Sequence, residues 1–499
     1  MSEDRLLLGV DIGTTGCRLC AVSAHGRVIG AARAHYSPEH PGEGRAEQDA
    51  ATWWGALCRC ARELFARVPA DSLAAVAVSG QSAPLLPLDA QGAPLRKAIL
   101  WQDTRASVQT AQIARNFGRA KVRSITGLPP AAFTIWPKIL WLQEREPTVF
   151  ERAMTFPSTT GYVTWRLCGR HALDRSSAMG YPIELETGRW SRTLCSWANF
   201  PTDRIPPILP CGSIVGHVSP QAAAEACLPE GLPVAAGGMD TACAALAVGA
   251  HAPGRAFEVT GTSGGFGIVA PRPSAEESLA VSAHLLPDVY INHAPMSAAG
   301  ASLEWFVRQF CHAERQEAQR RGVSAYEILE EQIDDLPDRP TGLLFLPYLA
   351  GERAPVWDPN ARGVALGFGL STTRAELARS IMEGVAYALR QNLDIARRAG
   401  LSPDALRSCG GGSASALWCQ IKADVMGLPV VAYPPQRDAA YGAALLAGLA
   451  AGVLTRDRLD SMLPDEGPTI YEPREEMSAL YAQHLERYRQ LYPHIRDLF

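Results

Sequence analysis

The chain has 499 residues, which is too long for a single hydrophobic core, so we expect two or more domains. Hydrophobic residues make up 47% of the sequence and charged residues 20%, and the net charge is −4. This balance describes an ordinary globular protein. Because it has no basic excess to attract nucleic acid or an anionic membrane, we expect neither as a partner.

The start of the chain predicts a cytoplasmic protein. Met1–Arg5 carries acids where a secretory signal would carry basic residues, and the apolar run that follows ends at Asp11. No apolar stretch in the sequence reaches the roughly 18 residues of a membrane helix.

Two stretches of the sequence repeat one another: DIGTTG at 11–16 and VTGTSG at 259–264. Each lies between two short apolar runs that read as strands, so each predicts a hairpin with a glycine-rich tip. Glycines let the backbone approach a ligand closely, and threonine hydroxyls and free amides supply donors, which suits a polyphosphate. Asp11 in the first copy is replaced by Val259 in the second, so only the first half carries an acid able to hold a metal ion.

The rest of the first half alternates strand and helix signals, which indicates an α/β fold. A third strand ends near Tyr36, a helix opens at Asp49 or Thr52, and buried strands cover Leu73–Ser79 and Ala98–Trp101. Polar residues follow both of these strands, the usual place for a site. Five prolines between Phe200 and Pro220 predict a connecting loop.

Asp240 follows a Gly-Gly strand and opens an apolar helix that runs to about Val248. An aspartate at such a position is most often a helix N-cap, worth about 1 kcal/mol. Its place beside the second hairpin also allows the carboxylate to reach a substrate hydroxyl group. A second domain begins near Ala250, which gives domains over 1–249 and 250–499.

The second half continues the pattern. We expect the hairpin at 256–270, helices from Gly300 and over Glu376–Arg398, and a strand over Leu406–Cys409 that runs into Gly410–Ser413. The three glycines read equally as a strand-to-helix turn or as a place where a flat ring or a sugar approaches the backbone. A helix over 417–426 and a strand over 429–433 follow.

These features favour phosphoryl transfer from a nucleotide, which needs a phosphate grip, a divalent cation and a base or positioner for the attacking hydroxyl. The sequence contains neither a Walker A pattern nor a Gly-x-Gly-x-x-Gly turn between strand and helix, so the paired hairpins must form the grip.

The motifs, taken in order, resemble those of the FGGY carbohydrate kinases, a family that includes xylulokinase and glycerol kinase. They are DIGTTG at 11, AEQD at 46, SGQ at 79, WQDTR at 101, Lys138 with Trp141-Leu142, GGMD at 237, GTSG at 261, YLAGERAPVWDPNARG at 348, ELARSIMEG at 376 and GGGS at 410. The resemblance covers nearly the whole chain. It implies two duplicated actin-like, ribonuclease-H-like ATPase domains with a cleft between them.

The resemblance also implies roles for individual residues. Asp11 would help to hold Mg²⁺, and Asp240 would be the base for the sugar hydroxyl. Residues implied near the transferred phosphoryl group are Thr14, Thr15 and Arg18, and those implied to line the adenine nucleotide site are Thr262, Gly300, Gly411 and Ser415. Glu304 stands where glycerol kinase has a glutamine at its nucleotide, so its role there is left open.

The sugar loop departs from the family pattern. Xylulokinases usually read Gln-Met-His-Gly where this chain has Gln81-Ser82-Ala83-Pro84, and they tend to have asparagine where it has Thr241. Since a site discriminates through buried polar groups that a wrong ligand leaves unpaired, these changes affect the choice of sugar rather than the phosphoryl chemistry. The residues expected to contact the sugar are Gln81, Ser82, Ala83, Trp101, Asp103, Asp240 and Thr241.

The sequence therefore predicts an ATP- and Mg²⁺-dependent kinase that phosphorylates a primary hydroxyl of a small sugar or polyol, first a ketopentose such as xylulose. Two alternatives stay open: an actin-like or Hsp70-like ATPase acting on a protein partner, and a sugar-binding regulator without catalysis. The retention of both Asp11 and Asp240 argues against the regulator. The oligomeric state is open, with a homodimer as the candidate.

Overall fold

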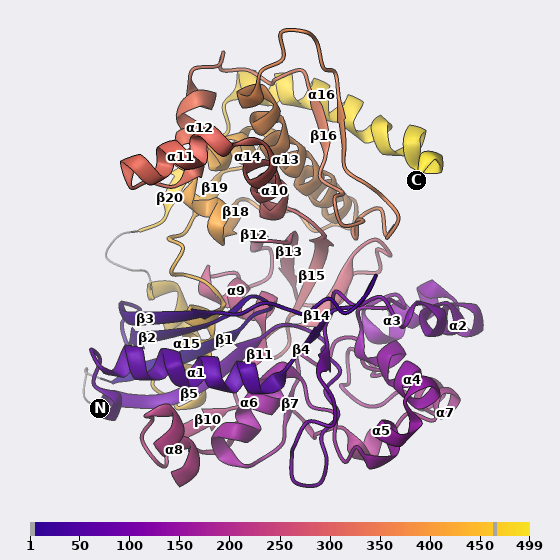
Figure 1. Ribbon diagram of the computed structural model, residues 1–499, viewed down its shortest axis with the longest axis vertical. Coiled ribbons are helices and arrows are strands. Elements are labelled where there is room, and N and C mark those ends of the chain that lie inside the picture. The colour runs from indigo at the N-terminus through magenta and orange to yellow at the C-terminus, as the bar shows by residue number, and fades with distance from the viewer. Residues whose placement is uncertain (1–4, 463–466) are drawn as a thin grey trace. The chain divides into compact units, whose positions relative to one another are not determined.

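A computed structural model describes residues 5–462 and 467–499 and divides the chain into two compact units (Figure 1). Unit 1 comprises residues 1–251, 271–291 and 436–467, and unit 2 comprises residues 252–270, 292–435 and 468–499. Two segments that follow residue 250 thus pack with unit 1. One of them, 436–467, carries a helix that matters for the site.

Unit 1 is built on a mixed sheet. Its strands lie in the order β3 (Val28–His35), β2 (Gly16–Ser23), β1 (Leu6–Ile12), β5 (Leu73–Gly80), β10 (Pro233–Ala235) and β9 (Ile214–His217), and β11 (Gly238–Met239) also pairs with β5. β1 and β2 form an antiparallel hairpin in which Asp11 faces Arg18, whereas β1 and β5 are parallel. Every residue of β1 and β5 is buried, which explains their nearly continuous apolar sequences.

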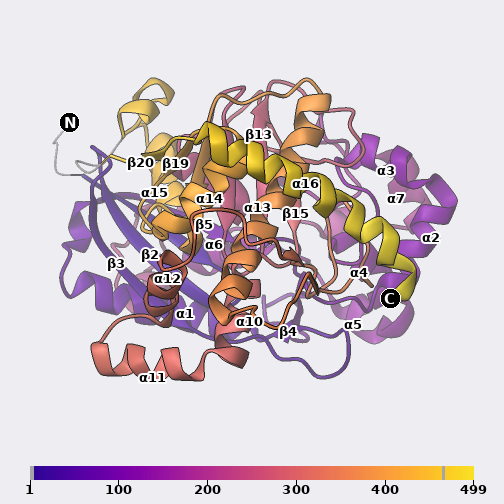
Figure 2. The ribbon, with the colours of Figure 1, turned by 90° about the horizontal axis from the view of Figure 1, so that it is seen from above.

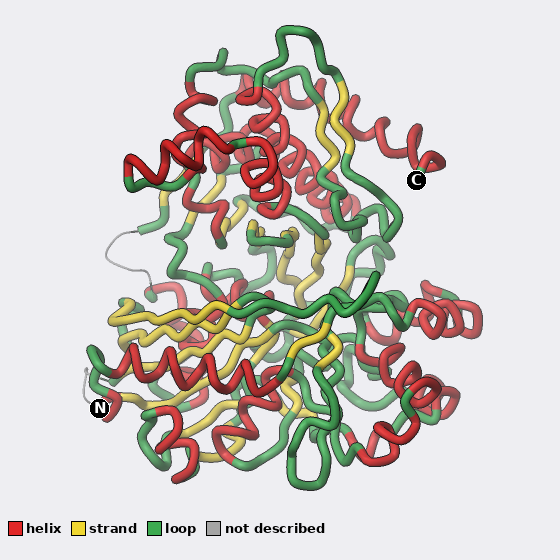
Figure 3. Tube along the Cα trace, in the orientation of Figure 1, coloured by secondary structure: helices red, strands yellow, loops and turns green. Residues whose placement is uncertain are grey.

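Helices cover the sheet of unit 1, as Figures 1 and 3 show. Alternate residues of β1, from Leu6 to Ile12, share one hydrophobic core with α1 (Ala50–Phe65). Its other residues meet α15 (Ala439–Ala450), which in turn packs on α9 (Asp240–Ala247). The contact with α15 is so close that a Cβ at Gly9 would lie 1.8 Å from the Ala440 carbonyl oxygen. Only a glycine fits there, and Asp11 lies on this same face.

The remaining elements of unit 1 surround the sheet. They are β4 (Glu47–Gln48), β6 (Ala98–Ile99), β7 (Leu173–Asp174) and β8 (Ile208–Leu209), with helices α2 (Ser107–Phe117), α3 (Arg119–Thr126), α4 (Ile135–Arg145), α5 (Pro147–Arg152), α6 (Thr159–Cys168), α7 (Arg192–Ala198) and α8 (Pro220–Ala226). A second core lies under α4 and contains Trp136, Ile139 and Leu142.

The sheet of unit 2 repeats the central arrangement of the sheet of unit 1. It runs β14 (Ala280–Ala283), β15 (Tyr290–Met296), β13 (Gly264–Ala270), β12 (Ala256–Thr260), β18 (Leu406–Cys409), β19 (Val430–Ala432) and β20 (Thr469–Tyr471). Each sheet contains an antiparallel hairpin, β1–β2 in one and β12–β13 in the other, and the first strand of each hairpin is parallel to its next neighbour, β5 or β18. The repeat seen in the sequence is therefore a repeat of the fold.

Unit 2 also holds a two-stranded sheet and the longest helices. These elements are β16 (Leu344–Leu346), β17 (Val364–Leu366), α10 (Gly300–Phe310), α11 (His312–Arg321), α12 (Ala325–Asp334), α13 (Arg374–Arg398), α14 (Ala416–Met426) and α16 (Glu475–Ile495). α13 packs on α14, and α16 runs across both (Figure 2).

Most elements expected from the sequence are confirmed, but the loop expected between Phe200 and Pro220 is wrong in part. Ile214–His217 forms β9, an edge strand antiparallel to β10. The prolines that suggested a loop flank this segment and do not occupy it, so all of its amide groups remain available for pairing.

Candidate active site

Three predicted site residues lie at the carboxyl ends of parallel strands in unit 1. Asp11 on β1 pairs with Ser79 on β5, and Met239 on β11 pairs with Gly80. Asp240 and Gln81 therefore directly follow neighbouring strands. Because side chains at the ends of adjacent parallel strands converge, the fold brings together an acid, an amide and a second acid that are far apart in the sequence.

Asp11 is a buried acid among other acids. Its Oδ1 accepts a hydrogen bond of 3.0 Å from the Ser79 hydroxyl. Burial, together with the negative charges of Asp438 and Asp240, raises the pKa of Asp11 to about 7, although Arg18 and Ser79 act in the opposite direction. The protein thus holds this carboxylate where it lacks full charge compensation, which is what a site for a cation requires.

Asp438 is a member of this cluster that was not predicted from the sequence. Its Oδ1 caps α15 by accepting bonds from the amides of Ala440 and Tyr441, and its Oδ2 accepts one of 3.0 Å from Arg18. Burial raises the pKa of Asp438. An aspartate before a run of small helical residues is an N-cap signal. That signal could have predicted the start of α15, but it could not have predicted that Asp438 lies near Asp11.

Asp240 is the first residue of α9 and is half-buried. Its Oδ1 accepts bonds from the Thr241 amide at 2.7 Å and the Thr241 hydroxyl at 3.2 Å. Met239, the residue before it, is fixed by a bond of 2.9 Å from its amide to the Ser176 hydroxyl. The side chain of Asp240 is therefore oriented by its neighbour and by the strand end that carries it.

A hydrogen-bond chain joins the first hairpin to the predicted sugar residues. The Trp101 indole donates to the Thr14 hydroxyl at 3.0 Å, and this hydroxyl donates to Gln81 Oε1 at 3.0 Å. Gln48 completes the chain, because its Oε1 accepts from Gln81 at 3.2 Å and its Nε2 donates to the Thr14 carbonyl at 3.1 Å. Gln48 belongs to the AEQD motif, but no role was predicted for it from the sequence.

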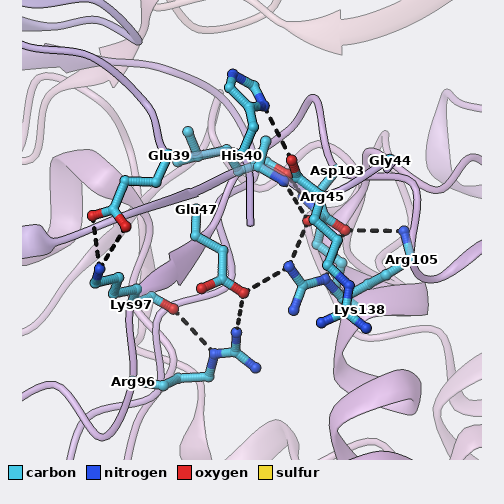
Figure 4. Close-up of polar contacts among 12 residues, drawn as sticks. Glu39, His40, Gly44, Arg45, Glu47, Arg96, Lys97, Asp103, Arg105 and Lys138 are labelled. Atoms are coloured by element: carbon cyan, nitrogen blue, oxygen red, sulfur yellow. Dashed lines mark hydrogen bonds and ion pairs between the residues drawn. The ribbon is translucent and has the colours of Figure 1, made fainter. Parts of the chain in front are cut away.

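Asp103 lies within an ion network, shown in Figure 4. Its Oδ1 accepts from the amide and Nε of Arg105, and its Oδ2 accepts from Arg105 Nη2 and the Ala46 amide, all within 2.9 Å. Burial raises the pKa of Asp103, but these bonds outweigh it and hold the pKa below its ordinary value. Glu47 binds Arg105 at 2.7 Å and Arg96 at 2.5 Å. Since a carboxylate has about four acceptor positions, a direct sugar contact would displace one of these donors.

The loop after β5 carries the departure from the family pattern. Ser82 is half-buried and Ala83 buried. Ala83 has a φ of 50°, a left-handed conformation that is uncommon for residues other than glycine. Its carbonyl oxygen accepts a hydrogen bond from Lys138. The small side chains at 82 and 83 are thus held on a backbone with a defined, costly shape.

In unit 2 the predicted nucleotide residues gather around the tip of the second hairpin. Gly300, which opens α10, donates its amide to the Gly261 carbonyl at 2.8 Å, and Ala301 donates to the Thr262 carbonyl at 3.1 Å. A Cβ at Gly300 would lie 2.5 Å from the Gly261 oxygen, so this contact requires glycine. Glu304 is on the first turns of the same helix and is exposed.

The glycine-rich turn 410–412 lies against the same hairpin, because β18 runs parallel to β12. A Cβ at Gly410 would come within 2.8 Å of the Thr260 oxygen. Gly411 follows in a short 3-10 helix, and the Ser415 hydroxyl caps α14 by accepting from the Trp418 amide at 3.0 Å. Unit 2 therefore brings Thr262, Gly300, Gly411 and Ser415 to one end of its sheet.

The fold and site define a protein with two repeated α/β units, each with a glycine-rich hairpin, and with paired acids in one unit. Residues 6–247 match the N-terminal domain, and residues 256–451 the C-terminal domain, of the FGGY family of carbohydrate kinases. The chain belongs to this family, and it is a phosphotransferase that phosphorylates a sugar with ATP.

Individual relatives agree over the full length. The xylulose kinase of Bacillus subtilis is 30% identical, and the match covers 99% of this chain and 98% of that protein. The xylulose kinase of Staphylococcus epidermidis strain RP62A is 32% identical, and the match covers 99% of this chain and 97% of that protein. The crystal structure of xylulose kinase from Rhodospirillum rubrum superimposes with a TM-score of 0.87 at 28% identity and covers 99% of both chains.

These findings confirm the fold class and the sugar kinase activity predicted from the motifs. The actin-like ATPase with a protein partner and the regulator without catalysis are not favoured. Within residues 5–462 and 467–499, no helix is long and apolar enough to cross a membrane.

Proposed function

We propose that this protein transfers the γ-phosphoryl group of ATP to a primary hydroxyl group of a ketopentose or a closely related ketose or polyol, with xylulose as the first candidate. The observation that carries the proposal is the convergence of Asp11, Gln81 and Asp240 at the ends of three neighbouring strands. The relatives described above as xylulose kinases support the class of sugar.

In this proposal Asp240 is the base. Its carboxylate accepts the proton of the sugar hydroxyl as the hydroxyl oxygen bonds to the γ-phosphorus and the bond from that phosphorus to the β,γ-bridging oxygen breaks. Thr241 holds Oδ1 of this carboxylate by two hydrogen bonds, one from its amide and one from its hydroxyl group. Thr241 thereby positions the base, in addition to its predicted contact with the sugar.

The residues around Asp11 fit a magnesium ion. Burial and two neighbouring acids destabilise the charged form of this carboxylate, so a nearby cation would stabilise it. No three His, Cys, Asp or Glu side chains in the described part of the chain are grouped to hold a metal ion by themselves. Mg²⁺ suits such a place, since it commonly uses one or two carboxylates and takes its other ligands from phosphates and water. When bound, it would neutralise charge on the phosphates.

In this proposal each hairpin has its own part in binding the nucleotide. We assign Thr14, Thr15 and Arg18 of unit 1 to the transferred group, and Thr262, Gly300, Gly411 and Ser415 of unit 2 to the adenine nucleotide. Close backbone packing at Gly300 and at Gly410 supports the second set, because it brings both segments against the second hairpin. A contact between Glu304 and the nucleotide is a prediction that its exposure permits.

For the sugar we assign Gln81, Ser82, Ala83, Trp101 and Thr241 as contacts. Asp103 acts in this proposal through the loop that it holds, since its four acceptor positions are engaged. The predicted direct contact of Asp103 requires a rearrangement of Arg105 when sugar binds.

The proposal is tested by coupled ADP release over a panel of ketoses, aldoses and polyols. We expect a ketopentose or a related ketose or polyol to raise ADP release at least tenfold above the sugar-free rate, and ³¹P NMR of the product to show a primary phosphate ester. Asp240→Asn is the matched control. If no compound raised the wild-type rate above that of Asp240→Asn, the proposed function would be wrong.

The cytoplasmic location and the homodimer also remain predictions. The use of ATP supports the first, and sedimentation velocity of the purified protein tests the second.

A further inference from the structure

Lys138 on α4 is a fully buried lysine whose ammonium group has no acidic hydrogen-bond partner among the described bonds. Its Nζ donates to three backbone carbonyl groups, those of Ala83 at 2.8 Å, Leu100 at 2.8 Å and Phe133 at 3.0 Å. An ammonium group has three donors, so all of them are used. Figure 4 shows this side chain beside Asp103 and Arg105.

Such an arrangement is costly for folding. Lysine is almost never fully buried without a counter-charge, and an apolar side chain would suit the core under α4 better. Burial is the main reason that the pKa of Lys138 is lowered to about 7; the charge of Asp103 opposes this effect and that of Arg105 adds to it. A residue kept at this cost should do something that a leucine or methionine cannot do.

The three carbonyl groups come from three separate segments, and two of these carry predicted sugar contacts. Ala83 is in the loop with Gln81 and Ser82, and Leu100 directly precedes Trp101. One ammonium group therefore joins the two loops whose side chains would face the sugar. It also binds the carbonyl of the residue with the left-handed backbone, and so helps to hold a conformation that alanine avoids.

The same two loops meet again through their side chains. Trp101 and Gln81 both bind the Thr14 hydroxyl, each at 3.0 Å. A shift of the backbone at residue 83 or 100 would lengthen these bonds and move both side chains. The positions of the Trp101 and Gln81 side chains thus depend on the two carbonyl groups that Lys138 binds.

We infer that Lys138 is a positioning residue for the sugar: by binding the carbonyl oxygens of Ala83 and Leu100 it fixes the two sugar-binding loops in the conformation that receives the substrate. The inference rests on the proposed function for the identity of these loops. It predicts that loss of the ammonium group weakens sugar binding specifically, whereas a purely structural lysine would affect stability alone.

The test compares Lys138→Met, which keeps the length of the side chain and removes the three donors, with Lys138→Arg, which keeps donors. Lys121→Met, on the exposed side of α3, is the control. For Lys138→Met we expect KM for the sugar and the Kd of sugar measured without nucleotide to rise at least tenfold, with KM for ATP within about twofold. Lys138→Arg should recover part of the loss. An unchanged sugar Kd, or an equal rise in both KM values, would overturn the inference.

A second measurement needs neither substrate nor activity, so it separates this inference from the proposed function. In the ligand-free protein, amide hydrogen exchange over residues 81–84 and 100–103 should be at least tenfold faster in Lys138→Met than in the wild type, with no change over residues 261–264. If Lys138→Met does not fold, Lys138→Arg is measured in the same way, because a guanidinium group cannot reproduce the three short bonds. Unchanged exchange in the folded variant would refute the positioning role, whatever the enzyme phosphorylates.

Discussion

The two glycine-rich hairpins share a topology, but their acidic residues differ in position along the strand and in the charged groups around them. In unit 1 the acid is Asp11, which lies near Asp438 and Asp240 and has a raised pKa. In unit 2 the corresponding position is Val259, and the acid stands one residue earlier, at Glu258. Since successive strand residues point to opposite faces, a shift of one residue moves the acid to the other side of the sheet.

Glu258 forms an ion pair with a buried lysine, whereas the charged neighbours of Asp11 include two acids. Its Oε1 lies 2.6 Å from Lys422 Nζ, both side chains are fully buried, and Thr260 donates to Oε2 at 2.6 Å. Lys422 also donates to the Thr260 hydroxyl at 3.0 Å. The same kind of antiparallel hairpin can therefore carry an acid with a structural role, as in β12–β13, or an acid with a proposed chemical role, as in β1–β2. The compensated acid joins the second hairpin to α14, whereas the under-compensated acid in the first hairpin would suit the proposed cation at a cost in stability.

The largest effect should come from Asp240, the proposed base. Asp240→Asn keeps the shape of the side chain but cannot accept the proton, and we expect kcat to fall by roughly 10²–10⁴-fold while nucleotide affinity stays unchanged. ADP release and nucleotide titration measure the two quantities. Asp71→Asn, an exposed acid before β5, is the control. Activity of Asp240→Asn within a few fold of the wild type would remove this residue from the mechanism.

The compensated acid should matter for stability. Glu258→Gln leaves Lys422 buried without its counter-charge, so we expect the free energy of unfolding in urea to drop by about 3–5 kcal/mol. The double variant Glu258→Leu/Lys422→Met removes both charges and should recover most of that loss. Equal stability of Glu258→Gln and the wild type would show that the pair is not the anchor of the second hairpin.

The under-compensated acid should behave in the opposite way. Asp11→Asn should remove Mg²⁺-dependent turnover with little effect on sugar affinity, and it should raise the free energy of unfolding by roughly 2 kcal/mol at pH 8. The sign follows from the pKa. In the folded protein the pKa of Asp11 is about 7 against an ordinary 3.8, so the folded wild type binds more protons and loses stability as pH rises from about 4 to 7.

The difference in the free energy of unfolding between Asp11→Asn and the wild type should depend on pH. The stability gained by Asp11→Asn should be small at pH 5 and should reach its full value above pH 7, as measured by urea unfolding at several pH values. A gain that is independent of pH, or a loss at pH 8, would mean that Asp11 is compensated in solution and that the contrast with Glu258 does not hold.

Local patterns were enough to predict much of this architecture. The runs that form β1, β2, β12 and β13 are apolar and bounded by glycine, and Asp49 caps α1 as its sequence position indicated. The motifs also identified the family and the residues that the strand ends bring together.

What the sequence could not provide was long-range pairing. Asp438 meets Arg18 across 420 residues, and no local pattern reports such a contact. Lys138 was noticed only as part of a motif, because its carbonyl partners at Ala83 and Leu100 are 55 and 38 residues away. Likewise, the saturation of Asp103 depends on donors from Ala46 and Arg105 that only the folded chain assembles.

The smallest effect, and the most informative about substrate, concerns the sugar loop of unit 1. Because Ser82 and Ala83 replace the larger Met-His pair usual in xylulokinases, the wild type lacks one donor near Gln81. We therefore expect D-xylulose to be matched by another ketose or polyol, and glycerol to be a poor substrate. A preference of kcat/KM for D-xylulose above about a hundredfold, roughly 2.7 kcal/mol, would contradict this interpretation.

Ala83→His adds an imidazole donor at the position where the family pattern has histidine. Histidine tolerates the left-handed conformation better than most residues, so the φ of 50° should be kept. We expect the ratio of kcat/KM for D-xylulose to that of the next best ketose to rise about tenfold, roughly 1.4 kcal/mol, with KM for ATP unchanged. Ala83→Ser, which adds a hydroxyl but no ring, should change the ratio by less than about twofold. If both variants shifted it equally, the volume of the loop rather than the lost imidazole would set the choice of sugar.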